Sequence, residues 1–384
     1  MILLLLGGVL LLAAAHPFLT YPLSLALAAR RRGAVAPLAA AARPQVAICM
    51  SVYNEEAVIV DKVETLLRQA AFYGPASINI YADGCSDRTV ALLEPYANRI
   101  NLIVSPARSG KTVGMRALIA STDAEVLMFT DANVIAPDSA VADLVAPLAD
   151  PEVGCVTAQL IYSNRRESAT SAVGALYWRI EEFIKRMEDH AMSLIGVDGA
   201  MFAIRRAHYH APPANLIDDL YVSLKVLLDG KRVTRAPQVL VRERSATASS
   251  EEFRRKARIA CQAMNVHRAL WPALRRLPPM LVYGYLSHRL IKWLMPFLLL
   301  GAGLCFVAAI ALWAGALTTL ALIGAGAVLL WLGTVAGLRP AGFVWATVTG
   351  LAGVARGVLE SLFTHQTYTV WEPASSVRSN AAEE

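Results

Sequence analysis

Apolar stretches without charge lie at the two ends of the chain, and a more polar segment separates them. Residues 2–28 contain no Lys, Arg, Asp or Glu. A bilayer core of about 30 Å needs about 20 such residues to be crossed as a helix. We therefore predict a transmembrane helix over residues 1–29. A signal peptide is the disfavoured alternative, because it would begin with a basic segment and have a shorter apolar run.

The second apolar region begins near residue 293. It predicts two spans, over residues 293–313 and 317–338. The following segment, 341–363, is also apolar, but Arg356 and Glu360 interrupt it, and a charge within a span is costly. This segment is either a third span or a helix that lies in the membrane interface.

Basic residues flank the apolar segments. Arg30, Arg31 and Arg32 follow the first segment directly, which places that side in the cytoplasm by the positive-inside rule. Arg339 after the second predicted C-terminal span indicates a return to the same side. The net charge is a modest +6, and the basic clusters lie near predicted membrane segments, at 30–32, 254–258 and 275–276. Membrane lipids are the expected partner of these clusters, and no motif supports binding of nucleic acid.

The middle of the chain alternates short apolar runs with helical patterns. Runs rich in β-formers cover residues 45–52, 77–83, 100–105 and 125–131, and helical patterns cover 55–71, 86–97 and 111–121. Such alternation predicts an α/β fold with a parallel sheet and helical crossovers. Substrates of these folds bind at the carboxyl ends of the strands, where Asn54, Asp83, Ser105 and Asp131 fall. The five cysteines are scattered without metal or redox spacing, so we expect reduced thiols.

Gly110, Lys111 and Thr112 match the last three residues of a phosphate-binding P-loop. The pattern needs a glycine where this chain has Ser105. Pro106 would also stiffen a loop whose backbone N–H groups must turn inward. ATP binding is therefore disfavoured, and Lys111 is either a solvated lysine at a helix start or part of a different site.

Seven short motifs follow one another through the middle segment. They are SVYNEE (51–56), YADGCSD (81–87), ARSGKTVGMRAL (107–118), FTDAN (129–133), DGAMFAIRR (198–206), IDDLYVSLKVLLDGKRV (217–233) and RRKARIA (254–260). In this order and at these spacings they resemble the family 2 glycosyltransferases, in particular the membrane-embedded synthases of cellulose, hyaluronan and poly-N-acetylglucosamine. The resemblance covers about residues 44–272 and the flanking helices. It implies a GT-A (Rossmann-like) glycosyltransferase domain with flanking transmembrane helices.

The resemblance implies a site for a nucleotide-sugar donor. Tyr53, Asn54 and Glu55 would line the nucleoside, and Asp83 would hydrogen-bond the uracil ring of a UDP-sugar. Lys111 would contact the phosphate or the sugar. From the residues alone, Asn and Asp-Gly are also ordinary constituents of turns.

FTDAN stands at the place of the family's DxD motif. The resemblance implies that Asp131 and Asn133 hold Mg²⁺ or Mn²⁺ together with the diphosphate. Asn133 replaces the second aspartate, and a neutral amide weakens the attraction for a metal. For so short a sequence, the alternative is a turn in which both side chains bond to local backbone.

IDDLYVSL resembles the family's acidic motif at a helix start. It implies that Asp219 is the base that takes the proton of the acceptor hydroxyl, with Asp218 as its neighbour. Two adjacent carboxylates repel each other, and in a dry pocket one pKa rises toward the operating pH. The same residues suit the first turn of a helix, where Asp satisfies free N–H groups, and both roles can hold together.

RRKARIA resembles the family's (Q/R)xxRW motif. Arg255 and Arg258 are implied to bind the diphosphate, since a guanidinium forms bidentate bonds. The alternative is a basic helix face on lipid. Ile259 stands where the polymerising synthases stack a tryptophan on the acceptor sugar, and it cannot stack in the same way. Asp198 and Gly199 are implied to wall the acceptor pocket, with the glycine allowing close approach.

Together these features predict an inverting, metal-dependent glycosyltransferase in the inner (plasma) membrane, with its catalytic domain in the cytoplasm. It would transfer sugar from a UDP-sugar to a growing β-linked exopolysaccharide. Because the membrane part is small for a conduit, export would need a partner subunit or a homo-oligomer. Single-sugar transfer to a lipid carrier or membrane lipid is the alternative. An inactive scaffold subunit and a P-loop ATPase are alternatives of other classes.

The predicted boundaries follow from the same features. They are a transmembrane helix (1–29), a cytoplasmic GT-A domain (44–249), interfacial amphipathic helices (250–290), a C-terminal transmembrane region (293–363) and a cytoplasmic tail (364–384).

Overall fold

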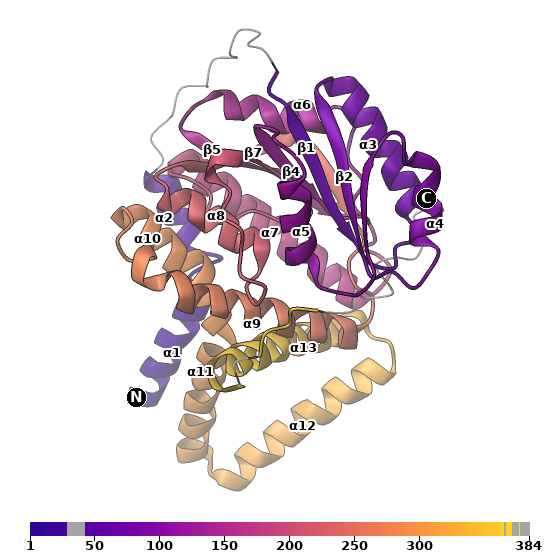
Figure 1. The fold of residues 1–384 in the computed structure, drawn as a ribbon. Coiled ribbons are helices and arrows are strands. Elements are labelled where there is room, and N and C mark those ends of the chain that lie inside the picture. The colour runs from indigo at the N-terminus through magenta and orange to yellow at the C-terminus, as the bar shows by residue number, and fades with distance from the viewer. Residues whose placement is uncertain (29–42, 365, 371–375, 377–384) are drawn as a thin grey trace.

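Seven strands form one mixed sheet in the order β3-β2-β1-β4-β6-β5-β7 in the computed structural model (Figure 1). The structure describes residues 1–28, 43–364, 366–370 and 376. The strands are β1 (Val46–Val52), β2 (Ala76–Asp83), β3 (Asn101–Ser105), β4 (Val126–Thr130), β5 (Val153–Tyr162), β6 (Met201–Arg205) and β7 (Arg232–Glu243). Strands β1 to β4 pair in parallel, and β6 runs antiparallel to both of its neighbours. The predicted α/β fold is confirmed.

Helices cover both faces of this sheet, which explains why β1 and β4 are apolar throughout. Ile48 and Met50 of β1 belong to the core with α3 (Ile59–Tyr73) and α6 (Ala140–Val145). Ala47 and Cys49 belong to the opposite core, with α5 and α8. The other helices of this part are α4 (Thr89–Leu93), α5 (Lys111–Ala120), α7 (Ala169–Ala191), α8 (Asp218–Leu228) and the 3₁₀ turns Glu94–Tyr96, Ala146–Ala149 and Arg206–His208.

The N-terminal apolar segment, predicted as one helix over residues 1–29, is broken into two helices in the structure. It forms α1 (Ile2–Ala15) and α2 (Thr20–Ala28), which meet at an angle of 58°. Pro17 lies at the break, where it lacks the backbone N–H that would continue the hydrogen bonds of the helix. Helix α1 packs along α11 (Ile291–Ala314), whereas α2 turns onto α7. The triple arginine at 30–32 lies outside the described residues.

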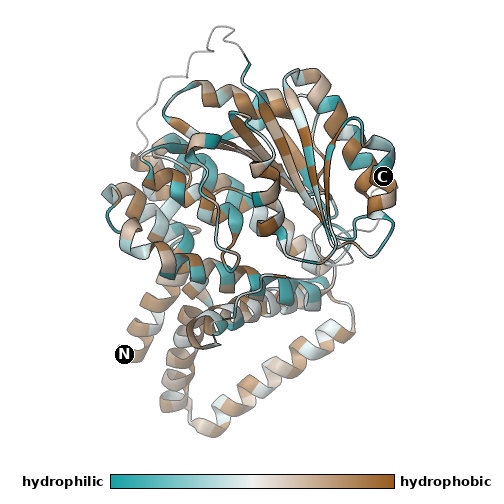
Figure 2. Cartoon of the chain, in the orientation of Figure 1, coloured by the Kyte–Doolittle hydropathy of each residue, from teal (hydrophilic) through white to brown (hydrophobic). Residues whose placement is uncertain are grey.

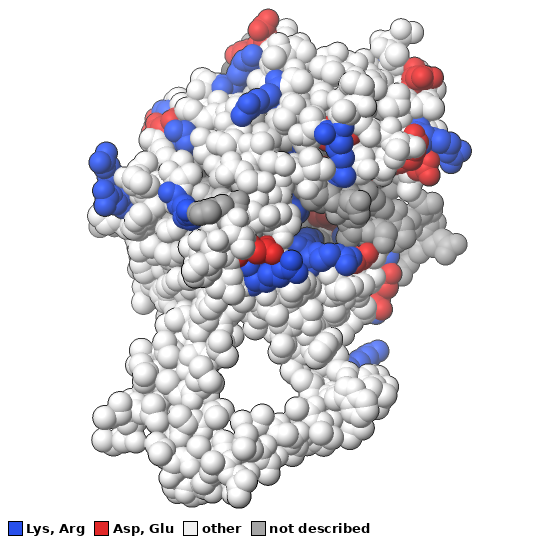
Figure 3. Space-filling model, turned by 60° about the horizontal axis from the view of Figure 1, so that its bottom comes forward, with Lys and Arg blue, Asp and Glu red and all other residues white. Residues whose placement is uncertain are grey.

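The boundary predicted near residue 290 also differs from the structure. Helix α10 (Pro279–Gly284), a π-helical turn (Tyr285–Leu290) and α11 (Ile291–Ala314) form one continuous helix of 36 residues. Helix α12 (Ala316–Val335) follows it after Gly315. Among the described residues, three helices are long and apolar enough to cross a membrane, or four if the bent pair α1–α2 counts as one span. Figures 2 and 3 show these helices as apolar, nearly charge-free projections below the domain.

Helix α13 (Arg339–Leu359) is the third of these candidates, and it lies beside the amphipathic α9 (Ser249–Leu274) (Figure 1). Gly353 permits this close packing, because a Cβ there would lie 2.7 Å from the carbonyl oxygen of Phe253. Arg356 and Glu360 form an ion pair of 2.7 Å, so these two charges partner each other. A π-helical turn, Glu360–Thr364, follows α13 directly.

A buried polar cluster joins the apolar helices α2 and α11 to helix α7 beside the sheet. The His288 ring bonds to Glu188 Oε1 at 2.6 Å through Nδ1 and to Glu181 Oε1 at 2.8 Å through Nε2. Tyr21 of α2 donates to the same oxygen of Glu188 at 2.7 Å, and Lys292 of α11 pairs with Glu181. Because buried charges are costly without partners, these pairings fix how α2, α7 and α11 meet.

Candidate active site

The carboxyl ends of β1 and β2 are tied together by Asn54. Its side-chain oxygen accepts from the backbone N–H of Ser86 at 2.9 Å, and its amide donates to Ser86 Oγ at 3.0 Å. Asn54 has φ 52°, a left-handed conformation that Asn adopts more readily than most residues. The next residue, Glu55, is buried, and its backbone N–H donates to Thr89 Oγ1 at 2.8 Å. These contacts shape the loop that was predicted to line a nucleoside.

Tyr53 and Asp83, both predicted to contact the nucleoside, have further contacts in the structure. The Arg108 guanidinium lies 3.6 Å from the centre of the Tyr53 ring, so a cation covers one face of the predicted nucleoside contact. Asp83 is buried and accepts from the backbone N–H groups of Ser109 (2.7 Å) and Gly110 (2.9 Å) and from Ser109 Oγ (2.9 Å). Asp83 therefore clamps the turn that precedes α5, and its contact with a base stays a prediction.

Lys111, at the start of α5, bridges two carboxylates. Its Nζ lies 3.0 Å from Asp131 Oδ1 and 3.2 Å from Asp218 Oδ2. Burial disfavours its charge, but the carboxylates of Asp131 and Asp218 outweigh burial and raise the pKa of Lys111. The lysine is thus a fixed cation between the end of β4 and the start of α8, and the structure excludes the solvated alternative for it.

The two acids at the start of α8 stand in different surroundings. Burial opposes the ionisation of Asp218, but the Lys111 ammonium outweighs it and lowers the pKa of Asp218. Burial, and after it the charge of Asp218, raises the pKa of Asp219 to about 7. A Cβ at Gly199 would lie only 3.2 Å from Asp219 Oδ2, so the glycine gives this carboxylate room. One acid is held ionised and its neighbour titrates near neutral pH, as acid–base chemistry requires.

The loop after β4 contains Asp131 and Asn133. The Asn133 amide donates to Glu243 Oε1 at 3.1 Å. Burial, and then the charge of Asp131, raises the pKa of Glu243 to about 7. Sequence analysis did not identify Glu243, which lies 110 residues from Asn133 in the chain. The only signal for it was an acid at the end of a run of alternating apolar residues.

Helix α9 contributes the two predicted arginines. Arg255 forms a bidentate pair with Glu252 at 2.8 and 2.9 Å. Arg258 is half-buried. Burial, and then the charge of Arg255, lowers its pKa to about 10, while the carboxylates of Asp218, Asp219 and Asp131 act in the opposite direction. Arg258 donates to Gln262 Oε1 at 3.2 Å, and it lies near enough to these three acids, the acid cluster, for their charges to act on it. Ile259 follows it, half-buried on the same helix.

Asp198 and the C-terminal segment complete the surroundings of the site. Asp198 is buried in an ion pair with Lys185 of α7. The predicted cytoplasmic tail is docked rather than free where it is described: the carbonyl oxygen of Tyr368 accepts from Gln262 Nε2 of α9 at 3.2 Å. The carbonyl of Thr369 lies against Gly110. The tail thus covers the turn that Asp83 clamps, which no local pattern indicated.

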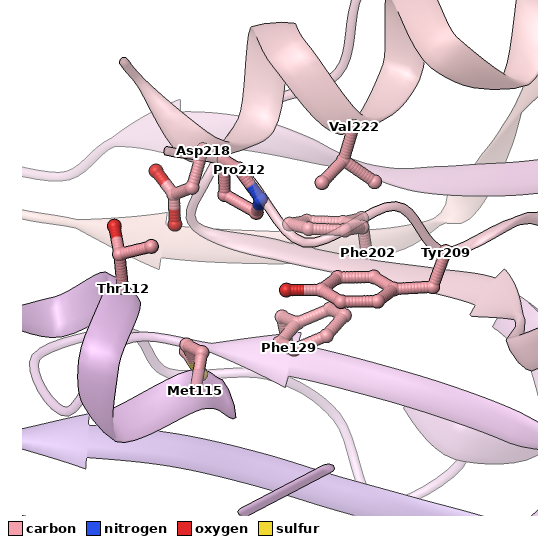
Figure 4. A pocket seen from close by; sticks show the side chains of 8 residues that line it. All are labelled: Thr112, Met115, Phe129, Phe202, Tyr209, Pro212, Asp218 and Val222. Carbon is pink, nitrogen blue, oxygen red and sulfur yellow. The ribbon is translucent and has the colours of Figure 1, made fainter. Parts of the chain in front are cut away.

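A small pocket backs the acid pair (Figure 4). In Figure 4 the Tyr209 hydroxyl points toward the space between Thr112, Met115 and Asp218. The Tyr209 ring stacks on Phe129 with centroids 5.5 Å apart, and Phe129 also contacts Phe202. This aromatic wall excludes water from one side of Asp218, which strengthens electrostatic interactions there.

The donor set fits a hard divalent cation. In the part of the chain that the structure describes, no group of three or more His, Cys, Asp or Glu side chains could hold a metal. Mg²⁺-type sites need less, because substrate phosphates and water complete the coordination of one or two carboxylates. Asp131 and the Asn133 side chain can supply such a partial set. The Lys111 ammonium lies 3.0 Å from Asp131 Oδ1, so one oxygen of this carboxylate already has a cationic partner.

Comparisons with known proteins agree on one class of enzyme. The model of a family described as glycosyltransferase like family 2 matches residues 44–262. N-acetylglucosaminyltransferases of Rhizobium leguminosarum bv. viciae and Azorhizobium caulinodans are 27% identical over 140 residues and 23% identical over 217 residues. These matches cover 35% and 52% of this chain, and 33% and 54% of the relatives, so the chain spans about half of their length or less.

A solved structure shares the fold over nearly the whole chain. It is a mannosyltransferase from Pyrobaculum calidifontis in complex with GDP-Man and Mn²⁺, with a TM-score of 0.73 and 21% identity. The match covers 95% of this chain and 100% of that one. At this identity the likeness concerns the fold alone.

Proposed function

Since the chain belongs to the glycosyltransferase-like family 2 and has a GT-A fold, we propose that it is an inverting transferase that uses a UDP-sugar. UDP-N-acetylglucosamine is the first donor to test, because the two relatives above are N-acetylglucosaminyltransferases. The protein would work at the inner membrane, with its catalytic part in the cytoplasm. Its apolar helices support a membrane location.

The unequal pair Asp218 and Asp219 carries this proposal. Asp218 is neutralised by Lys111, whereas Asp219 has a pKa of about 7 and lies against Gly199. Such a carboxylate can take a proton near neutral pH. The acceptor oxygen would form its bond to the anomeric carbon as the bond to the diphosphate breaks. The hydroxyl proton would move to Asp219, and the nucleoside diphosphate would leave with the bonding pair.

The departing diphosphate needs positive charge around it. Lys111 and Arg258 lie at the acid cluster and can bind phosphate oxygens, and Arg255 lies one helical turn from Arg258. A divalent cation, Mg²⁺ or Mn²⁺, held by Asp131 and Asn133 would neutralise charge on the leaving group. Asp83 would act on the donor mainly through the turn that it clamps, since that turn leads into Lys111.

Two classes of acceptor are proposed for this site. A growing β-linked polysaccharide follows from the sequence resemblance, with export through a partner subunit or a second copy. A lipid-linked acceptor is supported by the small number of candidate membrane spans among the described residues, three or, with the bent pair, four. Figure 3 shows a gap ringed by the C-terminal helices below the catalytic part, and helix α12 buries only Thr319 and Gly333.

The test is UDP release by the purified protein in lipid nanodiscs, with UDP-N-acetylglucosamine, UDP-glucose and, as an alternative donor, GDP-mannose. Mg²⁺ or Mn²⁺ is added, and products are sized and extracted into organic solvent. Release from one donor, lost in Asp131→Ala and Asp219→Asn, supports the proposal. Asp229→Asn is the matched control, because Asp229 pairs with His208 and His210 instead. Full activity of Asp219→Asn would refute the assigned base.

A further inference from the structure

Glu243 stands beside the position at which this chain departs from the DxD motif. Asn133 occupies the third place of FTDAN and lacks the negative charge of an aspartate. Its amide nitrogen donates to Glu243 Oε1 at 3.1 Å. The charged groups that act on Glu243 are Asp131, Arg255 and Asp198, all of them residues of the site described above. The carboxylate of Glu243, which comes from a distant strand, therefore lies next to the position where the second carboxylate of the DxD motif is missing.

The backbone holds Glu243 in this place. The N–H of Ile135 donates to the carbonyl of Arg242 at 2.9 Å, and the N–H of Arg242 donates to the carbonyl of Ile135 at 2.8 Å. These two bonds fasten the loop after β4 to the end of β7. On its other side Glu243 pairs with Tyr162 of β5, and its carbonyl accepts from the Ser163 N–H at 3.0 Å. The approach of Glu243 to Asn133 is thus built into the sheet.

The hydrogen bond decides which atom of Asn133 is available. An asparagine side chain has one oxygen that accepts and one NH₂ group that donates. Because the NH₂ group is used by Glu243, the oxygen is left for other partners, and hard divalent cations bind oxygen. A carboxylate that accepts a hydrogen bond from a metal-binding side chain orients it and makes it a better ligand.

We propose that Glu243 is a positioning residue of the metal site, which orients the Asn133 amide and supplies the negative charge that Asn133 lacks. When Glu243 is ionised, Asp131 and Glu243 together carry two negative charges, as two aspartates of a DxD motif would, and a divalent cation bound beside Glu243 would favour that ionised form. In this chain the second negative charge is at the end of β7 and not in the loop after β4. This inference rests on the proposed metal-dependent function and extends it to a residue on a different strand.

The direct measurement is Mn²⁺ binding in the presence of UDP, read from the electron paramagnetic resonance signal of free Mn²⁺ over the protein in nanodiscs. Glu243→Gln removes the charge but keeps an oxygen that can accept from Asn133. We expect it to weaken Mn²⁺ binding by about 10- to 100-fold, the usual effect of altering a residue that supports a metal ligand. The double variant Asn133→Asp with Glu243→Gln returns the charge to the loop and should bind within a few-fold of the wild type.

Glu152→Gln is the matched control, since Glu152 is an exposed acid that pairs with Lys231. Unchanged Mn²⁺ binding in Glu243→Gln would overturn the inference while leaving the proposed function intact. If the double variant binds Mn²⁺ as weakly as Glu243→Gln, a charge at position 133 does not replace the charge at position 243, and that part of the inference is overturned. Recovery in the double variant cannot come from a misfolded protein, so it excludes a purely structural effect of the single substitution. If the wild type with UDP does not bind Mn²⁺, the metal-dependent function and this inference both fail.

Discussion

The unequal acids of α8 lead to a signed prediction for the pH profile. With a pKa of about 7, Asp219 is deprotonated in about one molecule in ten at pH 6 and in about nine in ten at pH 8. The rate should therefore rise with pH, reach half its plateau near pH 7, and stay level above pH 8. An Asp with an ordinary pKa would put this rise about three pH units lower.

Two substitutions should move the rise in opposite directions. Asp218→Asn removes the nearby charge that raises the pKa of Asp219, so the rise should shift to lower pH. Because burial is the larger cause and persists in the variant, we expect a shift of about one pH unit, or about 1.4 kcal/mol. Lys111→Met removes a cation that lowers the pKa of Asp219, so the rise should shift to higher pH.

The assay is the initial rate of UDP release between pH 5 and pH 9, at low donor concentration for kcat/KM and at saturation for kcat. Lower rates alone would not test the reasoning, since both side chains have other contacts. The direction of each shift tests it. If both variants shift in the same direction, or neither shifts, the rise belongs to another group and Asp219 is not the base. Asp229→Asn should leave the profile in place.

Three further predictions concern the space beside Asp219, the turn that Asp83 holds, and the polar junction between the sheet domain and the apolar helices. Gly199→Ala would place a Cβ 3.2 Å from Asp219 Oδ2 and should lower kcat by about tenfold; an unchanged kcat would show that the carboxylate has free space. Asp83→Asn turns an NH₂ group toward the donors of the 109–110 turn, so thermal unfolding should show that the free energy of unfolding falls by about 1–3 kcal/mol. The KM for the sugar donor should rise. A wild-type KM would show that this turn does not contribute to donor binding. His288→Ala leaves Glu181 and Glu188 without their shared ring and should cost about 3–5 kcal/mol of stability in detergent, whereas His190→Ala, at an exposed bond to its own helix, should cost little.

The sequence alone determined the elements and the chemistry at their ends. Strands β1 to β4 and helix α3 follow local hydrophobic periodicity, which depends only on which faces are buried. Parallel strands end at one edge, so Asp83 and Asp131 could be placed near a common site without coordinates. The order of the seven motifs indicated the family, which the comparison confirmed. The break at Pro17 after α1 was not predicted, because the uncharged run extends through it.

The tertiary structure decided what each side chain meets. Asp218 and Asp219 are adjacent and chemically identical in the sequence, and only their surroundings separate them. Lys111 lowers the pKa of Asp218, whereas burial and the charge of Asp218 raise the pKa of Asp219 to about 7. Glu243 reaches Asn133 because β7 closes the far end of the sheet and its last residues pair with the β4 loop. These properties depend on distances between residues far apart in the chain. Electrostatic and hydrogen-bond energies change steeply with such distances, whereas the patterns that can be read along a sequence describe only neighbours.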